Sequence, residues 1–222
     1  MTTALSLTRA SRATAGLSRG WREIAAVPLD LAATRGRSNP LTALEDSISP
    51  GRATLSTAGR LKYAYLAYFS KPAADRILYR EVRRQRAGKI LAIGLPATLL
   101  ATRLMQVAAD VVASDSSHFA AIDLFEARPS DNPGLALKEA YRLLKASGQK
   151  VQLIPGDPQS ALVRSANSLG QRDLILISGE FDETSIGGGW YYVPRMLHAQ
   201  TRVYVESRGE GDIAQWQLLP PL

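Results

Sequence analysis

The chain has 222 residues, of which 45% are hydrophobic, and its formal net charge is +7. This length and composition suit one folded domain with an extension, and they exclude a chain that is disordered throughout. There is no cysteine and there are only two histidines, His118 and His198, so disulfides, thiolate sites and histidine-rich metal sites are not expected. We therefore expect no bound metal. No apolar run approaches the roughly 20 residues that a membrane-spanning helix needs.

Residues 1–60 differ in composition from the rest of the chain. They are rich in Ser, Thr, Ala, Arg and Gly, and the first acidic residue is Glu23. A start of this kind is typical of organelle transit peptides, and it also suits a flexible arm with short helical pieces. We favour the arm. We expect a partly flexible extension over 1–60 and an α/β domain over 61–222, in a cytoplasmic protein for which organelle targeting stays open.

Residues 61–88 are predicted to form two leading helices that carry the excess positive charge. Nine Lys or Arg lie between residues 60 and 89, against Asp75 and Glu81 only, while the rest of the chain is balanced. Pro72 suits the first position of the second helix, and Gly88 suits its end. The arginines that lie opposite the apolar face are Arg76, Arg80, Arg83 and Arg84. This basic face is either merely solvated, or it binds nucleic acid or another anionic partner.

Residues 89–207 alternate between short apolar runs and helical patterns. The predicted strands are Ile90–Leu95, Phe119–Phe125, Val151–Ile154, Leu174–Ser178 and Arg202–Glu206, and Ile213–Leu219 can add an edge strand. The predicted helices are Ala97–Ala113, Gly134–Ala146, Pro158–Leu169 and a less regular Thr184–Leu197. The alternation predicts an α/β fold, namely a Rossmann-like, doubly wound, mostly parallel sheet of five or six strands flanked by helices.

The strand ends supply four candidate binding residues: Gly94, Asp123, Asp157 and Ser178. Ligands of doubly wound sheets bind outside the carboxyl ends of the strands, and a glycine there allows close approach of the backbone. Asp123 lies inside an apolar strand, where a carboxylate needs a partner, either a ligand or a salt bridge. Asp157 precedes a proline, as a helix N-cap does. The acidic cluster of Glu180, Asp182 and Glu183 suits a solvated loop.

In their order and spacing, these strand ends resemble the Rossmann-like class I S-adenosylmethionine-dependent methyltransferase superfamily over residues 89–207. The resemblance implies a divergent methyltransferase of unknown acceptor, with S-adenosyl-L-methionine as cofactor. It implies that Gly94 approaches the cofactor, that Asp123 accepts the ribose hydroxyls and that Asp157 reads the adenine amino group. Ser178 then lies on the substrate side, where metal-dependent O-methyltransferases of the family often have aspartate. No catalytic base is indicated.

Three positions near the first strand depart from the family pattern. Ala92 stands where an acid is usual, and Pro96 and Thr98 stand where further glycines are usual. Proline removes a backbone donor and fixes φ, so the loop is stiffer than the usual one. The alternative is a catalytically inactive, methyltransferase-like binding or scaffold module that uses the basic helix. Neither the methyl acceptor nor the oligomeric state is indicated by any pattern.

Overall fold

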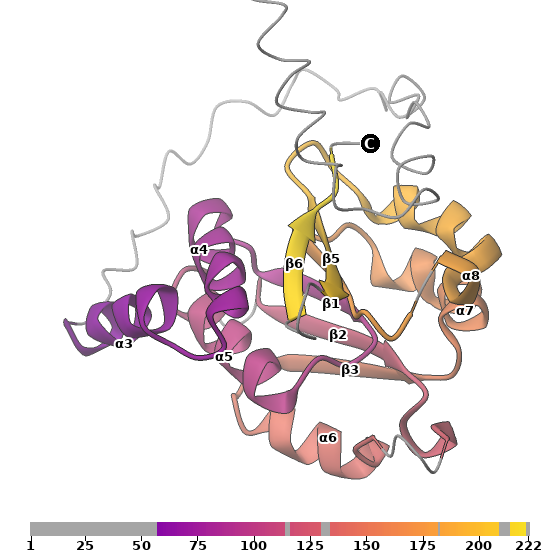
Figure 1. The fold of residues 1–222 in the computed structure, drawn as a ribbon, viewed down its shortest axis with the longest axis horizontal. Coiled ribbons are helices and arrows are strands. Elements are labelled where there is room, and N and C mark those ends of the chain that lie inside the picture. Colours follow the sequence, from indigo (N-terminus) through magenta and orange to yellow (C-terminus); the bar gives the residue numbers. More distant parts are fainter. Residues whose placement is uncertain (1–56, 114–115, 130–133, 182, 209–213, 221–222) are drawn as a thin grey trace, which may run out of the picture.

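The computed structural model describes residues 57–113, 116–129, 134–181, 183–208 and 214–220. The predicted N-terminal arm lies outside the described residues except for its last four, which belong to the helix α3 (Thr57–Tyr68). A six-stranded sheet forms the centre of the molecule (Figure 1). Its strands are β1 (Lys89–Ile93), β2 (His118–Asp123), β3 (Lys150–Pro155), β4 (Leu174–Ile177), β5 (Arg202–Arg208) and β6 (Ala214–Leu218).

The strand order is β3-β2-β1-β4-β5-β6. The first five strands are parallel, and β6 runs antiparallel to β5 at the edge of the sheet. This arrangement confirms the predicted doubly wound sheet with an added edge strand. The chain leaves β1 for β2 on one side and later returns to β4 on the other. The gap between the carboxyl ends of β1 and β4 is therefore the topological switch point, where ligands of such sheets bind.

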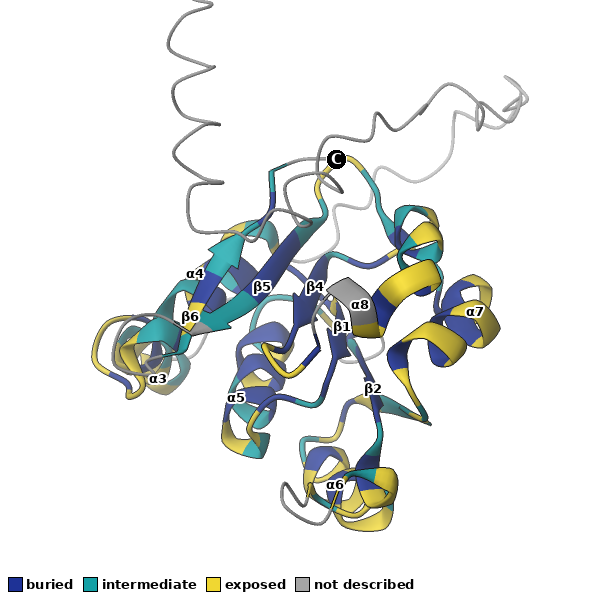
Figure 2. Ribbon diagram, turned by 45° about the vertical axis from the view of Figure 1, so that its right-hand side comes forward, coloured by how far each residue is buried: buried dark blue, intermediate teal, exposed yellow. Residues whose placement is uncertain are grey.

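Helices cover both faces of the sheet. One face carries α4 (Arg76–Gln85), α5 (Thr98–Ala109) and α6 (Leu137–Lys145), and the other carries α7 (Pro158–Leu169), α8 (Glu183–Ile186) and the 3₁₀ segment η5 (Gly187–Met196). Successive side chains of β1 alternate between the two layers, because strand side chains point to opposite faces: Ile90 and Ala92 pack in the first, Leu91 and Ile93 in the second. The central strands are consequently buried on both sides (Figure 2).

Several predicted helix boundaries need correction. The helix α5 ends at Ala109 and not at Ala113, and α6 begins at Leu137 and not at Gly134. Pro72 precedes the 3₁₀ turn Ala73–Asp75, and the second leading helix begins only at Arg76.

The second leading helix ends at Gln85, not at Gly88, because Arg86 adopts a left-handed conformation with φ 55° and its N–H bonds back to Arg83. The expected helix Thr184–Leu197 is a short α8 followed by η5, which contains Pro194. Gly187 has φ 42° and Pro194 offers no amide hydrogen, so a continuous α-helix cannot form there. Across the described ranges, no helix has the length and apolar character needed to cross a bilayer.

Candidate functional site at the carboxyl ends of the strands

Gly94 marks the switch point, directly after β1. Its φ is +82°, and its amide donates a hydrogen bond to the carbonyl of Ile122 at 2.7 Å. A Cβ at this position would lie 2.7 Å from the Cβ of Ser178 and 2.8 Å from the ring of Phe181. Both the backbone conformation and the packing therefore require glycine. The side chains of Ser178 and Phe181, which follow β4, occupy the space that a Cβ of residue 94 would need.

Asp123 ends β2 and is 2% exposed. One carboxylate oxygen accepts hydrogen bonds from the amide of Leu95 at 2.6 Å and from Nη2 of Arg128 at 2.8 Å. The other accepts from the amide of Phe125 at 3.1 Å and from Nε of Arg128 at 2.9 Å. Paired, bidentate geometry of this kind is the strong form of an Arg–carboxylate contact. The buried charge that the sequence left without an assigned partner is thus matched within the chain.

Arg128 extends the ion pair across the switch point. Its third nitrogen, Nη1, binds Glu180, which follows β4. Hydrogen bonding to Asp123 is the main reason why the pKa of Arg128 lies above its ordinary value, and the bond to Glu180 adds to the effect. The turn that brings Arg128 back to Asp123 runs through η4 (Phe125–Ala127), where Phe125 has φ 48°. A non-glycine residue in this region is strained, as is common near functional sites.

Two hollows flank the β1–α5 loop and share its residues Leu95–Ala97 together with Glu180. The β2-side hollow has a volume of about 330 Å³ and is bordered by Asp123 and Arg128. The β5-side hollow has a volume of about 260 Å³ and lies over the ends of β4 and β5. Two adjoining hollows thus lie at the switch point, one on each side of the β1–α5 loop.

Carboxylates and a tryptophan line the β5-side hollow. Asp75 is 7% exposed and accepts a hydrogen bond from Nε1 of Trp216 at 3.2 Å. Burial raises the pKa of this carboxyl, and the nearby charge of Glu206 raises it further. Glu206 itself accepts from the hydroxyl of Ser178 at 3.2 Å and from the amide of Gly179 at 3.1 Å. The hollow therefore contains groups able to accept a proton or bind a donor.

The four predicted residues do not all meet in one hollow. Asp123 borders the β2-side hollow, and Ser178 borders the β5-side hollow. Gly94 is buried between them, and Asp157 is exposed and borders neither. Asp157 caps α7 by accepting the amide of Ser160 at 2.9 Å, a bond that lowers its pKa.

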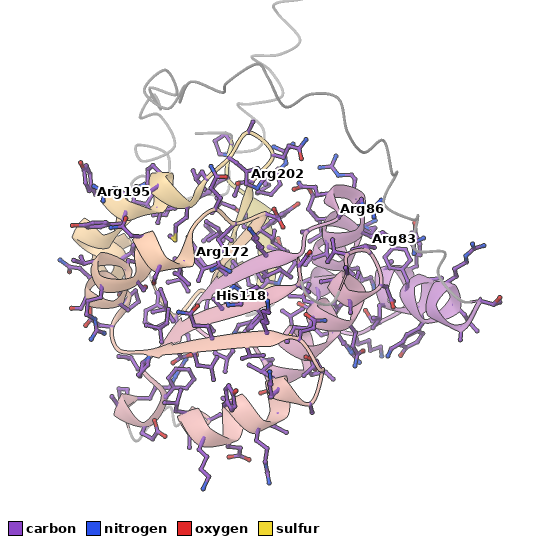
Figure 3. The ribbon with its side chains drawn as sticks, turned by 180° about the vertical axis from the view of Figure 1, so that it is seen from behind. Arg83, Arg86, His118, Arg172, Arg195 and Arg202 are labelled. Atoms are coloured by element: carbon purple, nitrogen blue, oxygen red, sulfur yellow. The ribbon has the colours of Figure 1, made fainter. Side chains whose placement is uncertain are left out.

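A second charged cluster lies at the opposite, amino ends of the same strands. Arg172 is fully buried, donates to the carbonyl of Leu169 at 2.6 Å and lies 3.2 Å from Nδ1 of His118 (Figure 3). Burial lowers the pKa of both groups, and the charge of Arg172 lowers that of His118 further. Asp173 accepts from the amides of Gly88 and Lys89 at 2.8 and 2.7 Å, and from His198 at 3.1 Å. This cluster borders neither hollow of the switch point.

The predicted basic face of α4 is partly engaged within the molecule. Nε of Arg76 donates to the carbonyl of Ser70 at 2.7 Å, and Arg83 lies 4.1 Å above the ring of Tyr63. Arg84 binds Glu81 through two nitrogens, at 2.6 and 3.1 Å. Arg80 is exposed. The face stays positively charged, although three of its four guanidinium groups already have partners.

Several groups at the switch point were not among the residues predicted from the sequence. Arg128 lies beyond the end of its strand, and Glu180 was assigned to a solvated loop. Asp75 and Trp216 meet across 141 positions of the chain, and Phe181 packs on Gly94 only because β1 and β4 are neighbours. An arginine five residues after a buried aspartate was the one local hint. Within the described ranges, no group of three His, Cys, Asp or Glu side chains is placed to hold a metal ion.

No known family profile matches the chain, and no curated protein matches it in sequence. Several solved structures are similar in fold. A methyltransferase from Geobacter sulfurreducens is 16% identical, with 68% of this chain and 70% of that chain covered and a TM-score of 0.40. The O-methyltransferase TomG from Streptomyces achromogenes, in complex with SAM, is 13% identical, with 69% and 66% covered and a TM-score of 0.44. An O-methyltransferase from Bacillus cereus, in complex with SAH, is 15% identical, with 72% and 68% covered and a TM-score of 0.44. The fold of this chain is established by its own strand order and connections.

Proposed function

We propose that the protein is an S-adenosylmethionine-dependent methyltransferase whose cofactor occupies the β2-side hollow. The observation that carries the proposal is the position of Asp123: a buried carboxylate at the end of β2, bordering a hollow of about 330 Å³ beside the switch point. This is where doubly wound sheets bind a nucleotide-like ligand, and an acid there can accept ribose hydroxyls. A cytoplasmic location is part of the proposal.

The residues of the β2-side hollow fit this cofactor on the condition that Arg128 releases Asp123. Both oxygens of Asp123 already accept two hydrogen bonds, so ribose hydroxyls bind there only in exchange for Arg128. Arg128 keeps Glu180 as a partner when it lets go of Asp123, which lowers the cost of the exchange. Gly94 would lie close to the cofactor and Ser178 towards the acceptor. The adenine would extend beyond the β2-side hollow to reach Asp157, which borders neither hollow.

The β5-side hollow is the proposed acceptor site. Bound S-adenosylmethionine supplies a methyl group activated on a sulfonium, and methyl transfer depends mainly on orienting the acceptor. Asp75 and Glu206 would orient a hydroxyl or amine by accepting its hydrogen. Asp75 is the proton acceptor of the proposal, because burial raises its pKa, and the hydrogen bond from Nε1 of Trp216 orients its carboxylate.

Calorimetry with S-adenosylmethionine and S-adenosylhomocysteine tests the cofactor site. The full chain should bind both ligands, Asp123→Asn should bind at least about tenfold more weakly, and Arg128→Gln should bind more tightly because the competitor of the ribose is gone. Asp173→Asn, at the opposite ends of the strands, is the matched control and should bind as the parent does. Absence of binding heat at millimolar ligand would rule the proposal out.

A second candidate is a methyltransferase-like module that does not catalyse, and two contacts favour it. Phe181 fills the space in front of Gly94, and Arg128 saturates Asp123. In this role the exposed basic helix α4, with Arg76, Arg80, Arg83 and Arg84, would contact nucleic acid or another anionic partner. Such binding weakens steeply with salt. The second candidate requires salt-dependent binding without any cofactor binding, and Arg80→Glu with Arg84→Glu should abolish it.

A further inference from the structure

The outer face of α3 carries an unusual group of exposed apolar side chains. Leu61, Tyr65 and Tyr68 recur at spacings of four and three, so they share one face of the helix, and Phe69 follows directly. Their exposures are 74%, 54% and 55%, and that of Phe69 is 70%. The opposite face of α3 contains Leu66 and Ala67, both buried. These four exposed residues form what we call the α3 patch. Contiguous exposed apolar surface of this kind is typical of a binding surface.

The charged residues of α3 and of the segment directly after it are basic, while the half-buried Asp110 at the end of α5 borders a hollow together with Lys62. Arg60 and Lys62 lie one residue before and after Leu61, about 100° round the helix on either side, and Lys71 follows the helix. All three are exposed. The acids of residues 57–89 are Asp75 and Glu81, and each is 7% exposed. The α3 patch is thus an apolar strip with basic side chains on both flanks.

The position of α3 suits contact with an extended surface. The helix projects at one end of the molecule, beyond α4 and away from the sheet, in both opposite views (Figures 1 and 3). The exposed side chains of the α3 patch thus lie on a helix at the edge of the domain, where a partner can approach. Exposed apolar and aromatic side chains beside basic ones suit the headgroup region of a bilayer, where apolar burial and attraction to anionic lipids act together.

The side chains of the α3 patch distinguish a lipid surface from nucleic acid. Leu61, the most exposed of the four, has no ring and cannot stack on a base. Tyrosine rings are favoured at the level of lipid headgroups, and long basic side chains reach anionic headgroups while their stems lie along apolar surface. We infer that the α3 patch binds the surface of an anionic phospholipid bilayer. Leu61 and Phe69 enter the acyl boundary, and Arg60, Lys62 and Lys71 bind the headgroups.

Co-sedimentation of the full chain with vesicles tests this inference. Vesicles of phosphatidylcholine containing about a quarter phosphatidylserine should bind the protein, vesicles of phosphatidylcholine alone should bind it much less, and added salt should release it. The double variant Leu61→Ser with Phe69→Ser should reduce binding at least tenfold, as should Arg60→Glu with Lys62→Glu. The matched control is Tyr141→Ser with Leu143→Ser, which removes exposed apolar side chains from α6 and should leave binding unchanged.

Three results would overturn the inference. The first is a full chain that stays in solution with anionic vesicles. The second is equal loss of binding in the α3 and α6 variants. The third is a different occupant: single-stranded RNA that binds the parent but not the α3 variant, or a dimer that the α3 variant dissociates, in either case without vesicle binding. All four substituted apolar side chains are at least partly exposed, so circular dichroism should show the parental fold in every variant. The cofactor titrations above are independent of this outcome.

Discussion

Arginine side chains at the two ends of the parallel strands have different kinds of partner. At the carboxyl ends, the guanidinium of Arg128 is matched by Asp123 and Glu180 and borders the β2-side hollow, and Glu180 borders both hollows. At the amino ends, the guanidinium of Arg172 is completely buried and binds a carbonyl and an imidazole, with its Nε left without a partner among the described atoms. The same type of side chain thus has charged partners at one end and neutral ones at the other.

This difference separates the proposed ligand-binding end of the strands from the end where the charges only join elements of the fold. The contacts at the amino ends join the starts of β1, β2 and β4 to each other and to the end of α7, where a positive charge is favourable. The contacts at the carboxyl ends are exchangeable, because carboxylates and a guanidinium beside a hollow can change partners when a ligand enters. The predictions below test that separation.

The largest effect is expected from Arg128→Met. The change leaves Asp123 as a buried carboxylate with two backbone donors only, and breaking a buried pair in this way costs about 4 kcal/mol of the free energy of unfolding. Urea unfolding at neutral pH measures it. Adding Asp123→Asn removes the unpaired charge and should recover most of the loss. A double variant no more stable than the single one would show that the pair does not act as a unit.

Gly94→Ala should cost about 3 kcal/mol, since it combines a left-handed backbone with overlap of Phe181 and Ser178. Gly148→Ala is the matched control, because Gly148 has a similar φ of 78° but nothing within 4 Å of the added Cβ. This control should lower the free energy of unfolding by only about 1 kcal/mol, which is the cost of placing alanine in a left-handed backbone conformation. Equal losses in urea unfolding would mean that packing at the switch point is not tight.

Arg172→Met should cost less than Arg128→Met, about 1–2 kcal/mol. It removes two hydrogen bonds to neutral groups but leaves no charge unpaired, and methionine fills much of the same volume. Urea unfolding of the two variants side by side gives the comparison directly. A loss as large as that of Arg128→Met would mean that the two ends of the strands are equally dependent on charge.

Asp157→Ala should cost about 1 kcal/mol, the usual value of a helix N-cap. Asp157→Asn keeps an oxygen that can accept the amide of Ser160, so it should be close to the parent in thermal unfolding. Titration with S-adenosylmethionine then separates the two roles of this residue. An adenine contact predicts that Asp157→Asn weakens binding, whereas capping alone predicts unchanged affinity.

The smallest effect is the pH dependence of His118. Its pKa is lowered by burial and by the charge of Arg172, so the unfolded chain binds a proton more readily than the folded one. The stabilisation is complete above the ordinary histidine pKa of about 6.5 and is lost as pH falls through the lowered value. His118→Gln should therefore lose less stability than the parent between about pH 7.5 and pH 5. Parallel losses in urea unfolding would contradict this assignment.

Much of the fold could be predicted from the sequence, because it depends on local patterns. The strand β4 and the helix α7 were located to within one residue, since apolar runs, an Asp-Pro start and a following glycine are short-range signals. The position of Asp123 was also predictable, since a lone carboxylate in an apolar strand stands out. The predicted edge strand pairs antiparallel with β5, but its direction depended on the neighbouring strand and not on its own residues.

The sequence by itself determined the α/β class, the order of strands and helices, and the strand ends to within two residues, because periodicity and turn signals act over a few residues. Only the tertiary structure determined which side chains the residues of the switch point contact. Arg128 reaches Asp123 through a strained turn, Phe181 covers Gly94 because β4 lies beside β1, and Trp216 meets Asp75 from the far end of the chain. Contacts of this kind depend on how the strands are ordered in space, and no local pattern encodes that order.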